Sequence, residues 1–120
     1  MDNKEFGLQL ELRTKKFAIA IVKLSAGLPN NSEGFVIRNH LTKSGTSIGA
    51  NYREVNRSRS KADFYNKIKI SESEANETAY WIEIIQELNW VVNSIIEPIN
   101  KEANELLAIF TSIAGKLKST

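Results

Sequence analysis

Hydrophobic residues recur along most of the chain in steps of three and four positions, which is the spacing of one face of an α-helix. These repeats fall into stretches separated by helix-stopping and turn-forming residues. They predict four helices, over about residues 7–27, 33–57, 61–88 and 94–118. Long helices joined by short turns must alternate in direction. We therefore expect one all-α domain over residues 1–120, an antiparallel up-down-up-down four-helix bundle.

The residues at the expected helix ends commonly cap helices. Serine accepts hydrogen bonds from the free N–H groups of a first turn, and glycine or asparagine adopts the left-handed conformation that ends a last turn. Such residues lie before the second and third helices, at the start of the fourth, and after the first and third: Ser32, Ser60, Ser94, Gly27 and Asn89. Glu97, three positions after Ser94, is expected to make a capping box with it. The predicted boundaries therefore rest on local chemistry as well as on periodicity.

The middle of the second expected helix is rich in small residues. Gly45 and Gly49 each cost the helix about 1 kcal/mol relative to alanine. Because they are four positions apart, they share a face that another helix can approach closely, inside the bundle or between subunits. A phosphate-binding loop is the alternative, but the Gly-Lys-Ser/Thr ending and the preceding strand are both missing. Ser47, Asn51 and Glu54 line one side of this helix, as a structural polar network or as a site open to a ligand.

Charge is distributed unevenly along a chain whose formal net charge is only +2. Residues 38–69 contain eight lysines and arginines against two acids, whereas residues 70–105 contain one lysine against eight glutamates. Either these segments neutralise each other between neighbouring helices or subunits, or the basic segment forms an anion-binding surface. The candidate cations, which can form one ridge across the second turn, are Arg53, Arg57, Arg59, Lys61, Lys67 and Lys69.

The sequence offers no set of catalytic or metal-binding residues. His40 is the single histidine, and neither a Ser-His-Asp set nor the Glu-x-x-His pairs of di-iron bundles can be assembled around it. Without cysteine there are no disulfides or thiolate zinc sites, and a reducing cytoplasm is the expected compartment. No apolar run approaches the about 20 residues of a membrane span, and the first residues do not resemble a signal peptide. We therefore expect a cytoplasmic protein without cofactor or membrane contact, and not an enzyme.

Aromatic residues exceed what one face of a small bundle needs. Tyr80 and Trp81 are adjacent, so they cannot both face the core of one helix, while Trp90 lies in an expected turn and Phe35 opens the second helix. Aromatic side chains on an outer face indicate a protein interface, although Tyr80 and Trp81 can instead flank the core. Oligomerisation is therefore expected.

Three segments resemble the ribosomal-RNA intervening-sequence protein family, a group of bacterial four-helix bundles. Residues 47–54 match its Ser-Ile-x-x-Asn-x-x-Glu signature, residues 60–64 are similar to its Ser-Lys-x-Asp-Phe stretch, and residues 74–81 resemble its Glu-rich, aromatic-ended third helix. The resemblance covers about residues 12–117. It implies a homo-oligomer, a pentamer forming a barrel with a central channel, and no established enzymatic activity. A related member, the accessory protein of diversity-generating retroelements, binds nucleic acid and associates with a reverse transcriptase.

Two hypotheses follow for function. The first is an oligomeric bundle that binds structured RNA or DNA through the basic segment. It would contact phosphates and not read bases, because no aromatic residues interleave the cations. The alternative is a scaffold that docks a partner protein through its exposed aromatics and its acidic third helix.

Overall fold

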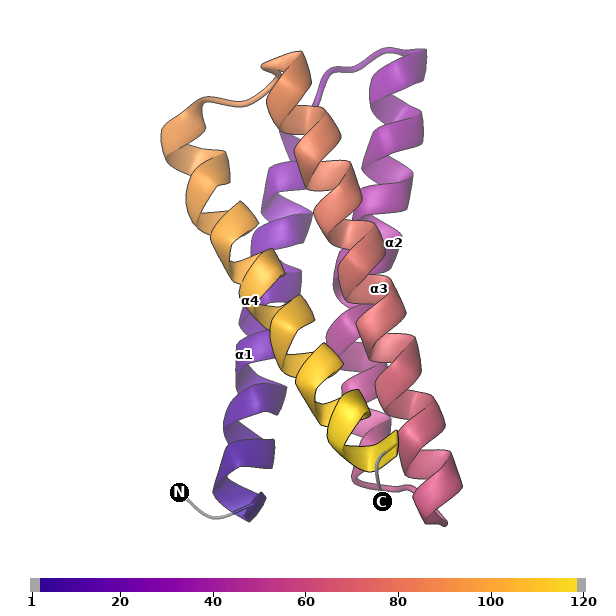
Figure 1. Cartoon of the computed structure of the whole chain (residues 1–120). Helices are drawn as coiled ribbons and strands as arrows, with labels where there is room; N and C mark the ends of the chain where they lie inside the picture. Colours follow the sequence, from indigo (N-terminus) through magenta and orange to yellow (C-terminus); the bar gives the residue numbers. More distant parts are fainter. Residues whose placement is uncertain (1–2, 119–120) are drawn as a thin grey trace.

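The computed structural model describes residues 3–118, and within them the chain forms four α-helices and no strand. The helices are α1 (Asn3–Ala26), α2 (Ser32–Val55), α3 (Lys61–Leu88) and α4 (Asn93–Lys118). They run alternately up and down, so that α1 begins and α4 ends at the same end of the bundle (Figure 1). The predicted antiparallel four-helix bundle is confirmed.

The ends of α3 form as the sequence predicts. The Ser60 hydroxyl accepts a hydrogen bond from the N–H of Asp63 at 3.1 Å, which caps the first turn. Asn89 ends the helix in the left-handed conformation, with a φ of 56°. Local capping chemistry therefore fixes the length of the longest helix.

The start of α2 differs slightly from the prediction, because Asn31 and not Ser32 is its N-cap. The Asn31 side chain accepts the N–H of Gly34 at 2.7 Å. A Cβ atom on Gly34 would lie only 1.9 Å from the carbonyl oxygen of Pro29. The missing side chain thus lets the preceding turn fold closely over the first turn of α2, which brings Asn31 into the capping position.

The start of α4 also differs, since the expected capping pair of Ser94 and Glu97 does not form. The N–H groups of Ile95 and Ile96 both donate to the carbonyl of Val92, so the helix has already begun before Ser94. The Glu97 carboxylate instead accepts a hydrogen bond from Gln86 of α3 at 3.3 Å.

The other ends shift by a few residues. α1 extends back to Asn3, with an acidic residue in its first turn that favours the helix dipole. It ends just before Gly27, whose N–H donates to the Leu24 carbonyl at 3.1 Å in a tightened turn and not in the left-handed conformation. α2 ends at Val55, two residues earlier than predicted.

The core is formed by the faces that the hydrophobic spacing predicts. Most small polar residues inside it form hydrogen bonds: the Ser71 hydroxyl, for example, donates to the Ile48 carbonyl at 3.1 Å and links α3 to α2. The buried Ser25 hydroxyl is the exception, since it has no partner among the described residues. Large side chains that are fully buried come from all four helices: Ile21, Leu41, Ile48, Ile68, Ile82, Ile85, Ile96, Leu106 and Phe110.

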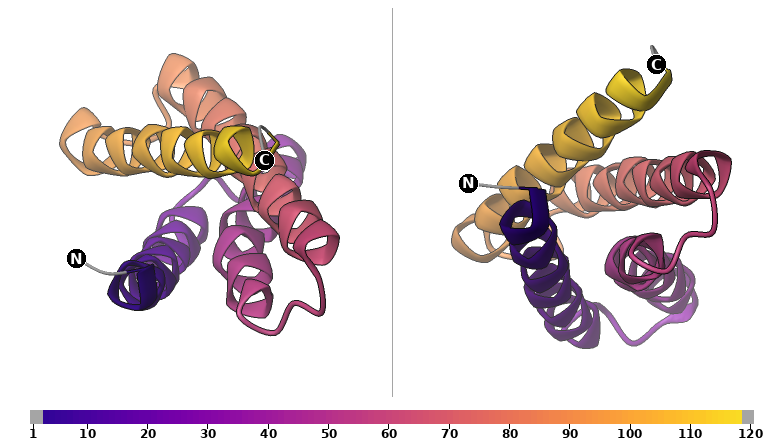
Figure 2. Two further views of the ribbon diagram at one scale, coloured as in Figure 1. Left: turned by 60° about the horizontal axis from the view of Figure 1, so that its bottom comes forward. Right: turned by 90° about the horizontal axis from the view of Figure 1, so that it is seen from below.

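The bundle is open at the end where α1 begins and α4 ends. α4 packs along α3 but crosses α1 obliquely and meets it over a short stretch (Figure 1). Beyond this crossing the two helices diverge, as the view from below in Figure 2 shows. The divergence places the start of α1 and the end of α4 on either side of a cavity.

Candidate nucleic-acid interface

The turn between α2 and α3 presents three exposed cationic side chains, Arg57, Arg59 and Lys61. None of them forms an ion pair with an acid among residues 3–118. The backbone of this turn is held in place, because the N–H of Arg59 donates to the Asp63 carboxylate at 3.0 Å and Ser60 caps α3. Like charges so close in sequence repel one another, and a bound anion would relieve that repulsion.

The other three predicted cations are paired with carboxylates of the same chain: Arg53 with Glu11 at 3.6 Å, Lys67 with Asp63 at 2.9 Å and Lys69 with Glu72 at 2.5 Å. The hydrogen bond from Lys67, and secondly the Arg59 N–H, hold the pKa of Asp63 below its usual range. The bond from Lys69 likewise lowers the pKa of Glu72. The structure therefore separates the predicted ridge into a group on the helices that forms ion pairs and a group in the turn that forms none among residues 3–118.

The antiparallel topology brings further positive charge to the same end of the molecule. The last turn of α4 carries Lys116 and Lys118. Leu117 between them lines a hollow of about 750 Å³ together with Arg59 and Lys61, so the end of α4 lies beside the α2–α3 turn. We call this region the basic end and define it by five residues: Arg57, Arg59, Lys61, Lys116 and Lys118.

The two glycines of α2 lie against α1 of the same chain. A Cβ atom on Gly45 would come within 2.6 Å of Ile21 Cγ2, and one on Gly49 within 2.9 Å of Thr14 Oγ1. Ile21 and Thr14 are both fully buried, so these α1 side chains occupy the space that larger residues would need. The role of this face is close helix packing.

The polar residues near the glycines bond within α2. The Ser47 hydroxyl donates to the Lys43 carbonyl at 2.5 Å, and the Asn51 amide donates to the Ser47 carbonyl at 2.8 Å. Glu54 is exposed further along the helix, and no side-chain hydrogen bond joins it to Ser47 or Asn51 among residues 3–118. The structure does not bring these side chains together as a ligand site.

The single histidine belongs to an aromatic group on the surface of α2 and α3. The ring of His40 stacks on Trp81 with 4.7 Å between ring centroids, and Tyr80 meets Trp81 edge to face at 5.1 Å. Trp81 also donates a hydrogen bond to Glu77 at 3.3 Å. Trp81 thus flanks the core, whereas Tyr80 is 57% exposed.

Neither a metal-binding group of side chains nor a membrane-spanning helix occurs among residues 3–118. No group of three or more His, Cys, Asp or Glu side chains is arranged to hold a metal ion. None of the described helices combines the length and hydrophobicity needed to cross a membrane.

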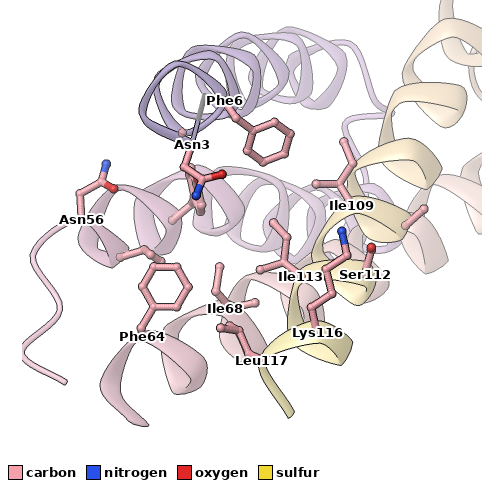
Figure 3. A pocket seen from close by; sticks show the side chains of 14 residues that line it. Asn3, Phe6, Asn56, Phe64, Ile68, Ile109, Ser112, Ile113, Lys116 and Leu117 are labelled. Carbon is pink, nitrogen blue, oxygen red and sulfur yellow. The ribbon is translucent and has the colours of Figure 1, made fainter. Parts of the chain in front are cut away.

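Sequence reasoning missed the cavity at the open end of the bundle. Its volume is about 940 Å³, and all four helices line it (Figure 3). Phe6 from α1 and Phe64 from α3 point toward the same space, with Ile113 and Lys116 of α4 opposite. Phe6 lies before the predicted start of the first helix, so it was not assigned to any face. No sequence signal brings it near Phe64.

The fold and the site define an antiparallel four-helix bundle with a basic end and an adjoining cavity. The family model of the 23S rRNA-intervening sequence protein matches residues 8–112, and the chain belongs to this family, as the sequence resemblance predicted. A crystal structure at 1.70 Å resolution of a protein of unknown function, from the S23 ribosomal protein family of Bacteroides thetaiotaomicron, is similar to this chain. It shares 38% sequence identity and a TM-score of 0.79, over 87% of this chain and 96% of that one. No curated protein matches the chain.

Proposed function

We propose that this protein is a non-enzymatic, oligomeric helical bundle that binds structured RNA or DNA through phosphate contacts at its basic end. The observation that carries the proposal is the α2–α3 turn, where Arg57, Arg59 and Lys61 are exposed and form no side-chain ion pair among the described residues. Contacts from lysine and arginine to phosphates supply most of the sequence-independent affinity of proteins for nucleic acids.

Interaction with helix dipoles accounts for the positions of three cations of the basic end but not for those of Arg59 and Lys61. Arg57 follows the C-terminus of α2, and Lys116 and Lys118 lie in the last turn of α4, where cations stabilise a helix. Arg59 and Lys61 lie at the N-terminus of α3, where the dipole disfavours positive charge. Since helix stability does not account for these two side chains, an external anion is the better explanation. A helix N-terminus itself attracts phosphate.

Self-association is part of the same proposal, with the pentamer as the expected assembly. The outward side of α1 carries a line of aliphatic side chains in helical spacing, each about half exposed: Leu8, Leu12, Ile19 and Val22. We call this line the outer stripe. An aliphatic line of this length on one helix is typical of an interface between subunits. Several copies would also multiply the phosphate contacts of one basic end.

A protein-docking scaffold remains the second candidate, and one observation favours it. Tyr80 is exposed on α3, beside a surface that includes Glu77 and Glu83. An aromatic side chain next to carboxylates suits a partner with basic residues. Binding to a protein that persists at high salt, without any binding to nucleic acid, would favour this candidate.

The proposal is tested by titrating the protein into labelled structured RNA and duplex DNA and following anisotropy at low and high salt. A variant with Arg57→Gln, Arg59→Gln and Lys61→Gln should bind both much more weakly. The matched control removes the same charge from exposed lysines of α1, with Lys15→Gln, Lys16→Gln and Lys23→Gln, and should bind nearly as the parent does. Equal losses in the two variants would show that net charge, not the basic end, governs binding.

A further inference from the structure

The cavity at the open end combines aromatic, apolar and polar groups. The rings of Phe6 and Phe64 line it from α1 and α3. The Phe6 side chain is 42% exposed, so its ring is accessible to a ligand. Amide groups of Asn3 and Asn56 and the hydroxyl of Ser112 also line it. A flat ligand with apolar faces and polar edges matches this mixture better than a purely aliphatic one does.

A tyrosine hydroxyl on the cavity lining forms no hydrogen bond within residues 3–118. Tyr52 is only 5% exposed and lines the cavity, and none of the hydrogen bonds among the described residues involves its hydroxyl. The hydroxyl oxygen lies 3.6 Å from the position that a Cβ atom on Gly7 would occupy, so the glycine leaves room beside it. Burial, and secondly the charge of Glu11, raise the pKa of Tyr52, which keeps the hydroxyl protonated as a donor. The hydroxyl is therefore available to donate a hydrogen bond to a polar edge of a ligand in the cavity.

The cavity adjoins two cations of the α2–α3 turn that form no ion pair among the described residues. A second hollow of about 750 Å³ shares Val55, Asn56, Phe64 and Leu117 with the first and is lined by Arg59 and Lys61. Phe64 therefore stands between an aromatic and apolar space on one side and a cationic space on the other. Alternation of cations with aromatic rings is how proteins hold single strands, whose phosphates and unstacked bases bind at separate points.

We propose that the open end binds single-stranded nucleic acid, with an unstacked base in the cavity against Phe6 and Phe64 and its phosphates at Arg59 and Lys61. This inference rests on the proposed function and adds the form of nucleic acid and the contact to a base. A base inside a duplex is stacked on both faces and cannot enter, so loops, bulges and ends of a structured RNA are the expected targets. The alternative occupant, an apolar helix of a partner protein, does not use the cations beside the cavity.

The test compares a labelled oligothymidylate with a strand of equal length whose central residues are abasic, because both keep the same phosphates. The wild-type protein should bind the base-bearing strand about tenfold more tightly, as expected from the loss of one base–aromatic contact. A variant with Phe6→Leu and Phe64→Leu keeps apolar side chains but loses both rings. It should lose that preference while its affinity for the abasic strand stays unchanged. The control Phe35→Leu, at a ring of similar exposure on the first turn of α2, should keep the preference.

Three outcomes would overturn the inference. A leucine variant that stays folded by circular dichroism and keeps the full preference would show that the cavity does not hold the base. Equal wild-type affinity for the two strands would do the same and leave the cavity to a partner helix. The proposed function would then survive if binding remains salt-dependent and sensitive to the basic end. If the Arg57, Arg59 and Lys61 variant binds both strands as the parent does, the inference and the proposed function both fail.

Discussion

Arg13 of α1 and Glu102 of α4 form a two-bond ion pair at the place where these helices meet, with 2.7 Å between Nε and Oε2 and 2.5 Å between Nη2 and Oε1. The hydrogen bond with Glu102 is the main cause that raises the pKa of Arg13. Since α1 and α4 share only a short contact, this pair is a principal link across the seam that borders the cavity.

Removing the pair should loosen that seam. Glu102→Gln leaves the side-chain shape but removes the charge, and we expect it to lower the free energy of unfolding by about 1 kcal/mol, since the pair is partly exposed. Urea denaturation measures the change. Glu105→Gln is the control, because Glu105 lies 3.7 Å from Arg13 and is more exposed. Equal effects of the two substitutions would mean that the two-bond geometry contributes nothing.

The glycine face of α2 gives a second prediction. Gly45→Ala places a methyl group against buried Ile21, and the overpacking should outweigh the gain in helix propensity, with a net loss of about 1 kcal/mol. Gly115→Ala in α4 meets nothing within 4 Å and should stabilise the protein by up to about 1 kcal/mol. Thermal and urea unfolding of both variants test the contrast. Stabilisation by both substitutions would contradict the close approach of α1 and α2.

The Asp63 carboxylate should contribute to the acid sensitivity of the fold. Its pKa is lowered in the folded state by Lys67 and by the Arg59 N–H. A lowered folded-state pKa means that the stabilisation is present above the unfolded pKa, about 3.9, and is lost as pH falls through the folded value. Asp63→Asn should therefore make the free energy of unfolding fall less steeply with acid than in the parent. Lys67→Met should act in the same direction, and parallel curves for all three proteins would refute the assignment.

The outer stripe of α1 predicts the route of self-association. Leu12→Glu places a charge in the middle of this stripe and should shift the protein to monomers in sedimentation velocity experiments. Ile70→Glu changes a similarly exposed aliphatic residue on α3 and should leave the assembly intact. An oligomer that withstands the first change and dissociates with the second would place the interface on α3.

The fold could be predicted from the sequence because the features that determine the fold are local. The cap at Ser60 and the left-handed Asn89 can be read from a few neighbouring residues, and hydrophobic spacing gives the buried faces. The site could be predicted only in part. Pairing of Arg53 with Glu11, and the meeting of Phe6 with Phe64 at one cavity, join residues far apart in sequence. They depend on how the helices pack against one another, which no local pattern encodes.

The salt dependence of binding to duplex DNA tests the central claim most directly, because each phosphate contact adds a fixed release of counterions. The account predicts that log K falls steeply with log salt for the wild-type protein. Loss of Arg57, Arg59 and Lys61 should make the slope shallower by about 0.9 for each contact removed, whereas loss of Lys15, Lys16 and Lys23 should leave it unchanged. Identical slopes for the three proteins, or no binding at low salt, would contradict the claim that the basic end holds phosphates.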